Sequence, residues 1–136
     1  MTNPLFVFDT SVLVSVVLLK DSIPQKALAK ALQKGKLAQS LATLDELKEV
    51  LERKKFDKYI TRDERMRFFK TLAEESALID VKLQITACRD PKDNKFLELA
   101  VSAQVQAIVS SDDDLRALHP FQGIAILTPS AFLAME

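Results

Sequence analysis

The stretch PLFVFDTSVLVSVVLL (Pro4–Leu19) sets the architecture of the chain, because it joins two apolar elements at a single acidic residue. LFVF is apolar throughout and rich in β-formers, which predicts a buried strand over residues 5–8. TSVLVSVVLL predicts an apolar helix over residues 10–19. No basic residue precedes the stretch, and Asp9 interrupts it well short of a membrane span. We therefore expect a strand followed by a helix, both buried, and neither a signal peptide nor a transmembrane segment.

The alternation of strands and helices continues along the chain. Thr43 and Thr61 are expected to cap two of the helices, and Asp90, followed by Pro91, a third. Short, continuously apolar strands that alternate with helices are typical of a parallel sheet covered on both faces. We therefore predict a three-layer α/β fold with a central, mostly parallel sheet, formed by residues 1–136 as one domain. Further strands are predicted at residues 36–40, 77–81, 107–111 and 124–128, and helices at 22–35, 43–56, 61–76, 90–104 and from Pro129.

The composition is that of an ordinary globular protein. Of the 136 residues, 48% are hydrophobic and 28% are charged, which argues against disorder. A single cysteine, Cys88, cannot form an internal disulfide, and this favours a reducing, cytoplasmic location. The only histidine, His119, leaves no set of ligands for a zinc site. Cys88 is expected to be a small buried residue and His119 a loop residue without a catalytic role.

The formal net charge is zero, but the charges are unevenly distributed. Residues 52–70 hold eight basic side chains against four acidic ones, so the remainder of the chain is acidic. A basic flank on a neutral chain suggests two surfaces with different roles. The segment is equally compatible with the solvated face of two helices.

Acidic residues recur where predicted strands end. Asp9 follows the first strand, Glu46 and Asp93 are expected in the first turns of later helices, and Asp112 and Asp114 follow the strand at 107–111. In a parallel sheet these positions share one edge, which is where such folds bind ligands. Each acid taken alone could instead cap a helix, complete a capping box or remain solvated.

Carboxylates clustered without histidine or cysteine favour hard cations, so we expect Mg²⁺ or Mn²⁺ at this edge. An ion there would relieve the repulsion among the acids, activate a water molecule and stabilise charge that develops on a phosphoryl group. The hydroxyl groups of Thr10, Ser11 and Ser110 are candidates to support the carboxylates by hydrogen bonds.

Four motifs in this order make the chain resemble the PIN-domain family, and within it VapC-type toxins of toxin–antitoxin pairs. They are FDTSVLVS, TLDELKEVL, RDPKDNKFLELA and IVSSDDDL, and together they span most of the chain. The resemblance implies an acidic metal site, with Asp113 at a variable, solvated position. The implied catalytic and metal-binding acids are Asp9, Glu46, Asp93 and Asp112, with Asp114 as an additional metal ligand.

The activity implied by the resemblance is metal-dependent hydrolysis of RNA phosphodiester bonds. An antitoxin protein would be the expected partner, and a homodimer is compatible with the resemblance. The basic segment would then contact the RNA backbone, since phosphate contacts supply affinity without sequence information. Candidate RNA contacts are Arg53, Lys54, Lys55 and Arg62.

Two alternatives belong to other functional classes. Asp9 could be phosphorylated in a phosphotransferase, but FDTSV lacks the second acid expected two residues later, and the paired acids of a receiver domain are also absent. The more serious alternative is an RNA-binding or partner-binding PIN-fold protein with little or no nuclease activity. Metal binding without RNA cleavage would identify that second class.

Overall fold

The computed structural model describes residues 3–135, in which helices and strands alternate as predicted. Two short 3₁₀ helices, Lys54–Phe56 and Pro91–Asp93, precede α4 and α5. The strands are β1 (Leu5–Phe8), β2 (Lys36–Gln39), β3 (Ala77–Leu78), β4 (Ala107–Val109) and β5 (Ala125–Leu127). The helices are α1 (Thr10–Leu18), α2 (Ile23–Lys34), α3 (Leu41–Leu51), α4 (Arg62–Glu75), α5 (Asn94–Ala103), α6 (Asp113–Arg116) and α7 (Pro129–Ala134).

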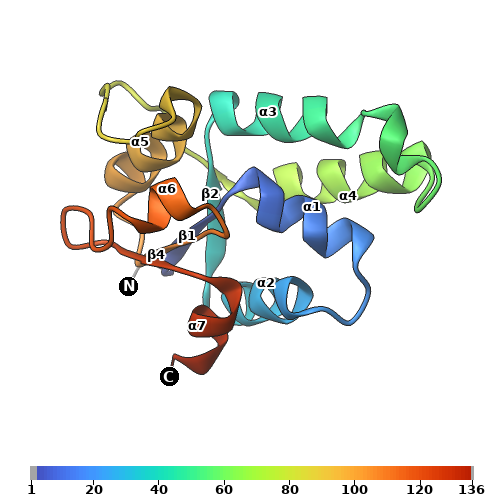
Figure 1. Cartoon of the computed structure of the whole chain (residues 1–136), viewed down its shortest axis with the longest axis horizontal. Coiled ribbons are helices and arrows are strands. Elements are labelled where there is room, and N and C mark those ends of the chain that lie inside the picture. Colours follow the sequence, from blue (N-terminus) through green and yellow to red (C-terminus); the bar gives the residue numbers. More distant parts are fainter. Residues whose placement is uncertain (1–2, 136) are drawn as a thin grey trace.

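The five strands form one sheet in the order β3-β2-β1-β4-β5. Every pairing between neighbouring strands is parallel, which confirms the predicted sheet type. Phe8 at the end of β1 lies opposite Val109 at the end of β4, so the two central strands finish level with each other. The chain segments that follow β1 and β4 therefore emerge side by side at one edge of the sheet (Figure 1).

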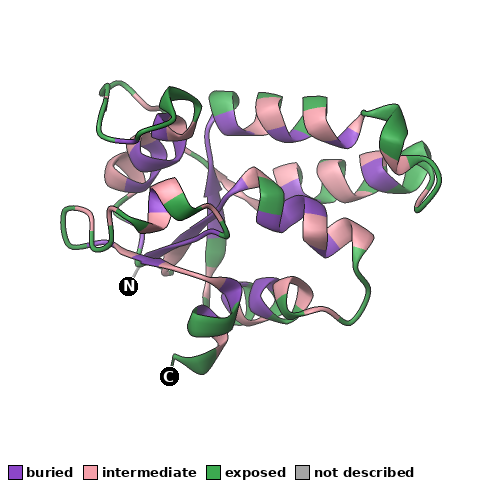
Figure 2. Ribbon diagram, in the orientation of Figure 1, coloured by how far each residue is buried: buried purple, intermediate pink, exposed green. Residues whose placement is uncertain are grey.

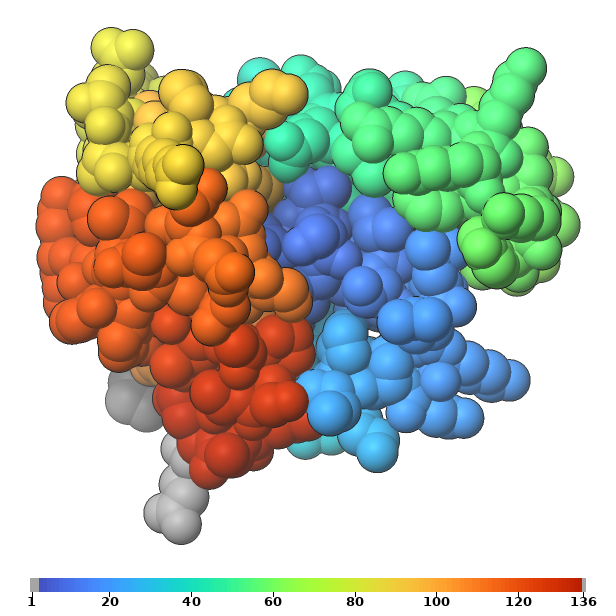
Figure 3. All heavy atoms as spheres, in the orientation of Figure 1, coloured from blue at the N-terminus to red at the C-terminus, as the bar shows by residue number. Residues whose placement is uncertain are grey.

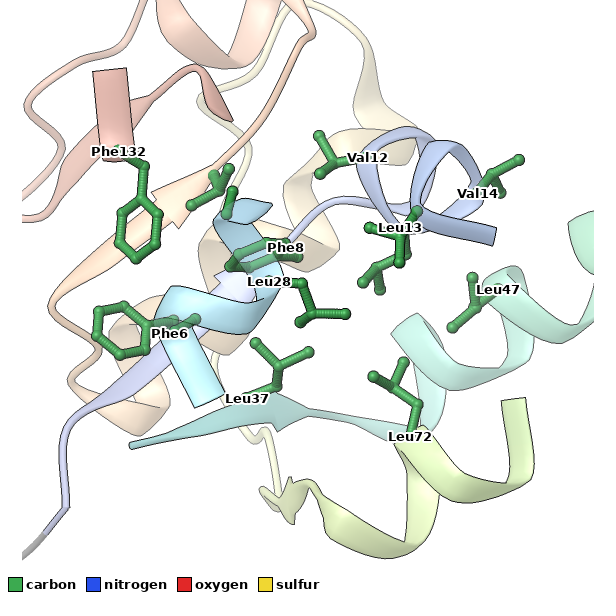
Figure 4. Close-up of a cluster of buried hydrophobic side chains, with 14 of the residues drawn as sticks. Phe6, Phe8, Val12, Leu13, Val14, Leu28, Leu37, Leu47, Leu72 and Phe132 are labelled. Carbon is green, nitrogen blue, oxygen red and sulfur yellow. The ribbon is translucent and has the colours of Figure 1, made fainter. Parts of the chain in front are cut away.

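Alternating side chains of the central strands enter two separate hydrophobic clusters. Phe6 and Phe8 point into a cluster with α1, α2, α3, α4 and α7, whereas Val7 points into one with α5 and α6. The Phe132 ring packs edge-on against both phenylalanines, with centroid distances of 5.4 and 6.0 Å (Figure 4). Both faces of the sheet are thus covered, as the purple buried strands in Figure 2 show, and the three-layer α/β fold is confirmed.

Several helix starts agree with the predicted capping signals. The Thr61 hydroxyl accepts a hydrogen bond from the backbone N–H of Glu64 at the start of α4. Gly35 follows α2, and a Cβ atom there would collide with the Pro4 carbonyl oxygen. The chain can therefore approach β1 this closely only with glycine at position 35.

The start of α3 differs from the prediction. Ser40 caps this helix, and Thr43 is its third residue; the Thr43 hydroxyl accepts a bond from the Ser40 backbone N–H at 2.9 Å. Glu46 therefore lies in the second turn instead of the first. Both serine and threonine are good caps, and a threonine three residues after a serine completes a reciprocal capping pair. The helix therefore begins after the earlier of the two capping residues, Ser40.

Several other elements are shorter than predicted. The helix predicted at residues 43–56 ends at Leu51, and the strand predicted at 77–81 is reduced to β3, Ala77–Leu78. Asp90 caps the 3₁₀ helix before α5, through a 3.1 Å bond from the Lys92 N–H. Asp93 consequently stands at the junction between that helix and α5.

No helix within residues 3–135 has both the length and the apolar character that are needed to cross a membrane.

Candidate active site

Asp9 is held at the end of β1 by three neighbours. Its Oδ1 atom accepts hydrogen bonds from the Val12 N–H at 2.9 Å and from the Ser11 hydroxyl at 3.1 Å. Its Oδ2 atom accepts a bond from the Ser110 hydroxyl, which comes from the end of β4. Asp9 caps α1 and is only 3% exposed, and this burial raises the pKa of its carboxyl group. The capping and functional interpretations of Asp9 are therefore compatible.

Ser110 connects the acids that follow the two central strands. While its hydroxyl donates to Asp9, the same oxygen accepts a bond from the Asp112 backbone N–H at 2.9 Å. The Asp112 carboxylate then caps α6 by accepting from the Asp114 N–H at 2.7 Å. One serine thus fixes the relative positions of Asp9 and Asp112.

The other two aspartates of the run lie apart from this arrangement. Asp113 is exposed and forms an ion pair with Arg116, in agreement with its predicted solvated position. Asp114 is half-buried in the first turn of α6, but it does not line the pocket described below.

Asp93, at the start of α5, lies close to Asp112 in the site. Its Oδ2 atom is buried without a hydrogen-bond partner. Burial, followed by the charge and shared hydrogen bond of Asp112, raises the pKa of Asp93 to about 7, with smaller contributions from Asp90 and Asp9. The charges of Asp112 and Asp9, from two distant segments of the chain, are therefore close enough to Asp93 to disfavour its ionisation.

Glu46 is held by a different set of contacts. Its Oε2 atom accepts a hydrogen bond from the Thr10 hydroxyl, and its Oε1 atom lies 2.9 Å from the Lys95 ammonium. The Glu46 and Lys95 side chains are 22% and 24% exposed, so the ion pair is largely shielded from water. Thr10 and Ser11 thus form hydrogen bonds with two different acids, Glu46 and Asp9.

These residues surround one open pocket of about 330 Å³. Figure 3 shows the dark-blue start of α1 between the teal and green segments of α3 and the orange chain after β4. Phe96 and Val50 form part of the wall, and Arg53 is the cationic side chain among the residues that line it. The polar lining consists of Asp9, Thr10, Ser11, Glu46, Arg53, Asp93 and Asp112.

The donor set of the pocket fits a hard divalent cation. It consists of carboxylate and hydroxyl oxygens, and it includes Asp93, whose buried Oδ2 atom has no hydrogen-bond partner. As placed in residues 3–135, no three acidic, histidine or cysteine side chains are grouped tightly enough to hold an ion together. The donor atoms are of the kind that Mg²⁺ and Mn²⁺ prefer, whereas Glu46 is engaged with Lys95.

Of the four predicted RNA contacts, Arg53 lines the pocket and the other three do not. Arg53 also pairs with Glu49 at 3.1 Å. Lys54 and Lys55 lie on the adjacent 3₁₀ helix, and Arg62 pairs with Glu52 at 3.0 Å, so these three are outside the lining. The basic segment also includes Arg65, which is fully buried and cannot contribute to a surface.

The roles expected for Cys88 and His119 agree with their environments. Cys88 is buried and free, and His119 Nδ1 accepts a 2.8 Å bond from the Ile126 N–H. The sequence interpretation missed Lys95. The available signal was a lysine two residues after Asp93 in the first turn of a helix, where a positive charge opposes the helix dipole.

The fold and pocket define a class: a parallel α/β domain with acidic side chains gathered where its central strands end. The family model described as PIN domain matches residues 6–114, and the chain belongs to this family. No match was found among curated proteins.

Solved structures share the fold at low sequence identity. VapBC2 from Rickettsia felis, bound to a DNA fragment from its promoter, has 11% identity and a TM-score of 0.60, covering 90% of this chain and 96% of that chain. VapBC-1 from nontypeable Haemophilus influenzae has 12% identity and a TM-score of 0.60, with 93% and 98% covered. VapBC-5 from Mycobacterium tuberculosis, of the VapBC toxin–antitoxin family, has 21% identity and a TM-score of 0.55, with 91% and 98% covered.

Replacing Asp93 with asparagine is expected to stabilise the metal-free protein at pH 8. A folded-state pKa of about 7, above the ordinary 3.8, means that stability falls as pH rises from about 4 to about 7. Asparagine cannot ionise, so the stability of the variant should not fall over this pH range for this reason. For a half-buried group we expect a gain of about 1–2 kcal/mol after allowance for solvent screening.

Thermal unfolding in EDTA at pH 8 and pH 4.5 checks this expectation. The difference between Asp93→Asn and wild type should be large at pH 8 and small at pH 4.5. The exposed variant Asp113→Asn serves as the control. Equal unfolding temperatures for Asp93→Asn and wild type at pH 8 would show that burial and the neighbouring carboxylates do not raise the pKa of Asp93.

Proposed function

We propose that the protein is a divalent-metal-dependent endoribonuclease of the cytoplasm that acts as the toxin of a toxin–antitoxin pair. The observation that carries the proposal is the meeting of Asp9, Asp93 and Asp112 in one pocket, with a buried Asp93 oxygen that has no partner. Repulsion among carboxylates is unfavourable unless a cation is bound, so the arrangement is best explained as a metal site.

Asp9, Asp93 and Asp112 are the residues that would hold Mg²⁺ or Mn²⁺, with Glu46 and Asp114 as additional acids. When bound, such an ion activates water and stabilises the charge that develops on a phosphoryl group. Ser110 fixes Asp9 and Asp112 relative to each other, and Ser11 and the Val12 N–H orient Asp9. A rigid set of ligands limits the reorganisation that binding and reaction require.

Arg53, which lines the pocket, would contact the RNA backbone beside the acids. Its side chain is 46% exposed, and its partner Glu49 is 65% exposed. An ion pair this exposed is weak, so a phosphate group can replace Glu49 at little cost. Phosphate contacts of this kind position RNA without reading its sequence.

The toxin role rests on the family and on the fold. The Rickettsia, Haemophilus and Mycobacterium structures carry the VapBC name, and the Mycobacterium protein belongs to a toxin–antitoxin family. An antitoxin partner for this chain follows by analogy of fold, which is a weaker argument than one from a site.

Incubation of the protein with a mixed RNA pool tests the nuclease. We expect cleavage with Mn²⁺ or Mg²⁺, none in EDTA, and a loss of cleavage in Asp93→Asn. Calorimetry with Mn²⁺ should be run in parallel on both proteins. Equal cleavage by both would mean a contaminant or a different site, and would contradict the mechanism.

The alternative, a binding protein with little nuclease activity, is favoured by one observation. Glu46 is occupied by Lys95 and Thr10, and no three acids in residues 3–135 are grouped to hold an ion. A folded wild-type protein that binds Mn²⁺ but leaves the RNA pool intact would establish this alternative.

A further inference from the structure

Lys95 occupies an unusual place beside the acidic pocket. It is the second residue of α5, yet its ammonium reaches across to Glu46 of α3, a residue 49 positions earlier in the chain. A lysine in the first turn opposes the helix dipole, so helix stability does not explain it. A largely shielded ion pair attracts more strongly than a surface pair, which gives Lys95 a specific electrostatic role.

The ammonium group is the counter-ion of an acid that belongs to the pocket. Glu46 lines the acidic pocket, whereas Lys95 lines a neighbouring groove of about 480 Å³ between the start of α3 and the segment after β3. Lys95 therefore stands at the boundary between the two. The other charged residues that line the groove, Asp80 and Glu98, are acidic, so Lys95 is the lining residue there that an anionic chain would contact.

We propose that Lys95 is a positioning residue with two successive partners: it neutralises Glu46 until a divalent cation enters the pocket, and it then contacts a phosphate oxygen of the RNA. The inference rests on the proposed function, because it needs both a metal and a nucleic acid. A cation in the pocket and the ammonium compete for the Glu46 carboxylate. Once the cation holds Glu46, the ammonium is free to pair with another anion.

The proposal predicts effects of opposite sign on two ligands. Lys95→Met removes a positive charge beside a ligand oxygen, so Mn²⁺ affinity should rise, by about tenfold. The same variant loses one phosphate contact, so RNA affinity should fall. In addition, the slope of log affinity against log salt concentration should become shallower by about 0.7, the value for one phosphate of a single strand.

The experiment compares Lys95→Met, Lys95→Gln and Lys95→Arg with Lys92→Met, which removes the same charge from an exposed position three residues earlier. Calorimetry with Mn²⁺ gives the metal affinity. Fluorescence polarisation of a labelled mixed-sequence RNA, with Ca²⁺ in place of Mn²⁺ to suppress cleavage, gives the RNA affinity and its salt slope. Lys95→Gln keeps a polar group beside Glu46 without the charge. It therefore replaces Lys95→Met in both measurements if Lys95→Met does not fold.

We expect Lys95→Met and Lys95→Gln to bind Mn²⁺ more tightly and RNA more weakly than wild type. Lys95→Arg keeps the positive charge and should bind RNA as wild type does. Lys92→Met should resemble wild type in both measurements. An unchanged or lower Mn²⁺ affinity in the folded Lys95 variants would overturn the competition with metal. A wild-type salt slope in those variants would overturn the phosphate contact. If wild-type protein binds no Mn²⁺ at all, the proposed function itself fails, and the inference fails with it.

Discussion

Asp9→Asn and Asp112→Asn are each expected to lower metal-dependent RNA cleavage by about 100-fold or more. Both substitutions remove a negative charge from the pocket that Asp93 also lines. Loss of a group that only orients a metal ligand typically reduces affinity or activity by about 10–100-fold, so loss of a ligand itself should exceed that range. The measurement is the rate of cleavage of a fixed RNA at saturating Mn²⁺.

Substitution by asparagine at these two positions should lower RNA cleavage without destabilising the fold. Asp9 caps α1 and Asp112 caps α6, each through a side-chain oxygen that asparagine retains. The pKa of Asp9 is raised by burial, so its ionised form is already disfavoured and a neutral amide should not weaken the fold. Unfolding temperatures close to or above that of wild type are therefore expected.

Asp113→Asn is the matched control, because it alters the same aspartate run at an exposed position outside the pocket. It should cleave RNA at the wild-type rate. Full activity in Asp9→Asn or Asp112→Asn would place the metal site elsewhere. Equal losses in all three variants would point to a general effect of charge.

Arg65→Met is expected to cause the largest loss of stability. The Arg65 side chain is fully buried, and its guanidinium donates to the carbonyl oxygens of Leu51 at 2.6 Å and Ile60 at 2.5 Å. It also pairs with Asp57 at 2.8 Å. These contacts give hydrogen-bond partners to carbonyl groups at the end of α3 and in the segment between α3 and α4. Without Arg65, those carbonyl groups would have no partner.

Methionine fills a similar volume but cannot donate a hydrogen bond, so these carbonyl groups lose their partner. Each buried polar group left unpaired costs about 1–3 kcal/mol, which gives a loss of about 3–5 kcal/mol in total. For a chain of this length, the unfolding temperature should fall by about 10–20 °C. Thermal unfolding followed by circular dichroism measures the change.

Arg67→Met, two residues later on the exposed side of α4, provides the comparison and should shift the unfolding temperature by little. If Arg65→Met unfolds within about 3 °C of wild type, the carbonyl groups of the segment find other partners, and Arg65 is not its main support.

The local signals of the sequence were sufficient for most of the fold. Apolar runs bounded by polar residues located all five strands, and their parallel arrangement followed from the alternation with helices. One error occurred where two signals competed within a few residues. Ser40 and Thr43 are both acceptable caps, and the end of β2 selects Ser40. The strand at 77–81 is shortened because it pairs with β2 through only two residues.

The sequence by itself determined where the acids Asp9, Asp93 and Asp112 would meet, because parallel strands all end at the same edge of the sheet. Only the tertiary structure decided the partner of Glu46 and the burial of Arg65. Both depend on contacts between segments that periodicity does not relate: α3 with α5 for Glu46 and Lys95, and α4 with the end of α3 for Arg65. Charge pairing of this kind depends on how helices pack, which local sequence patterns do not specify.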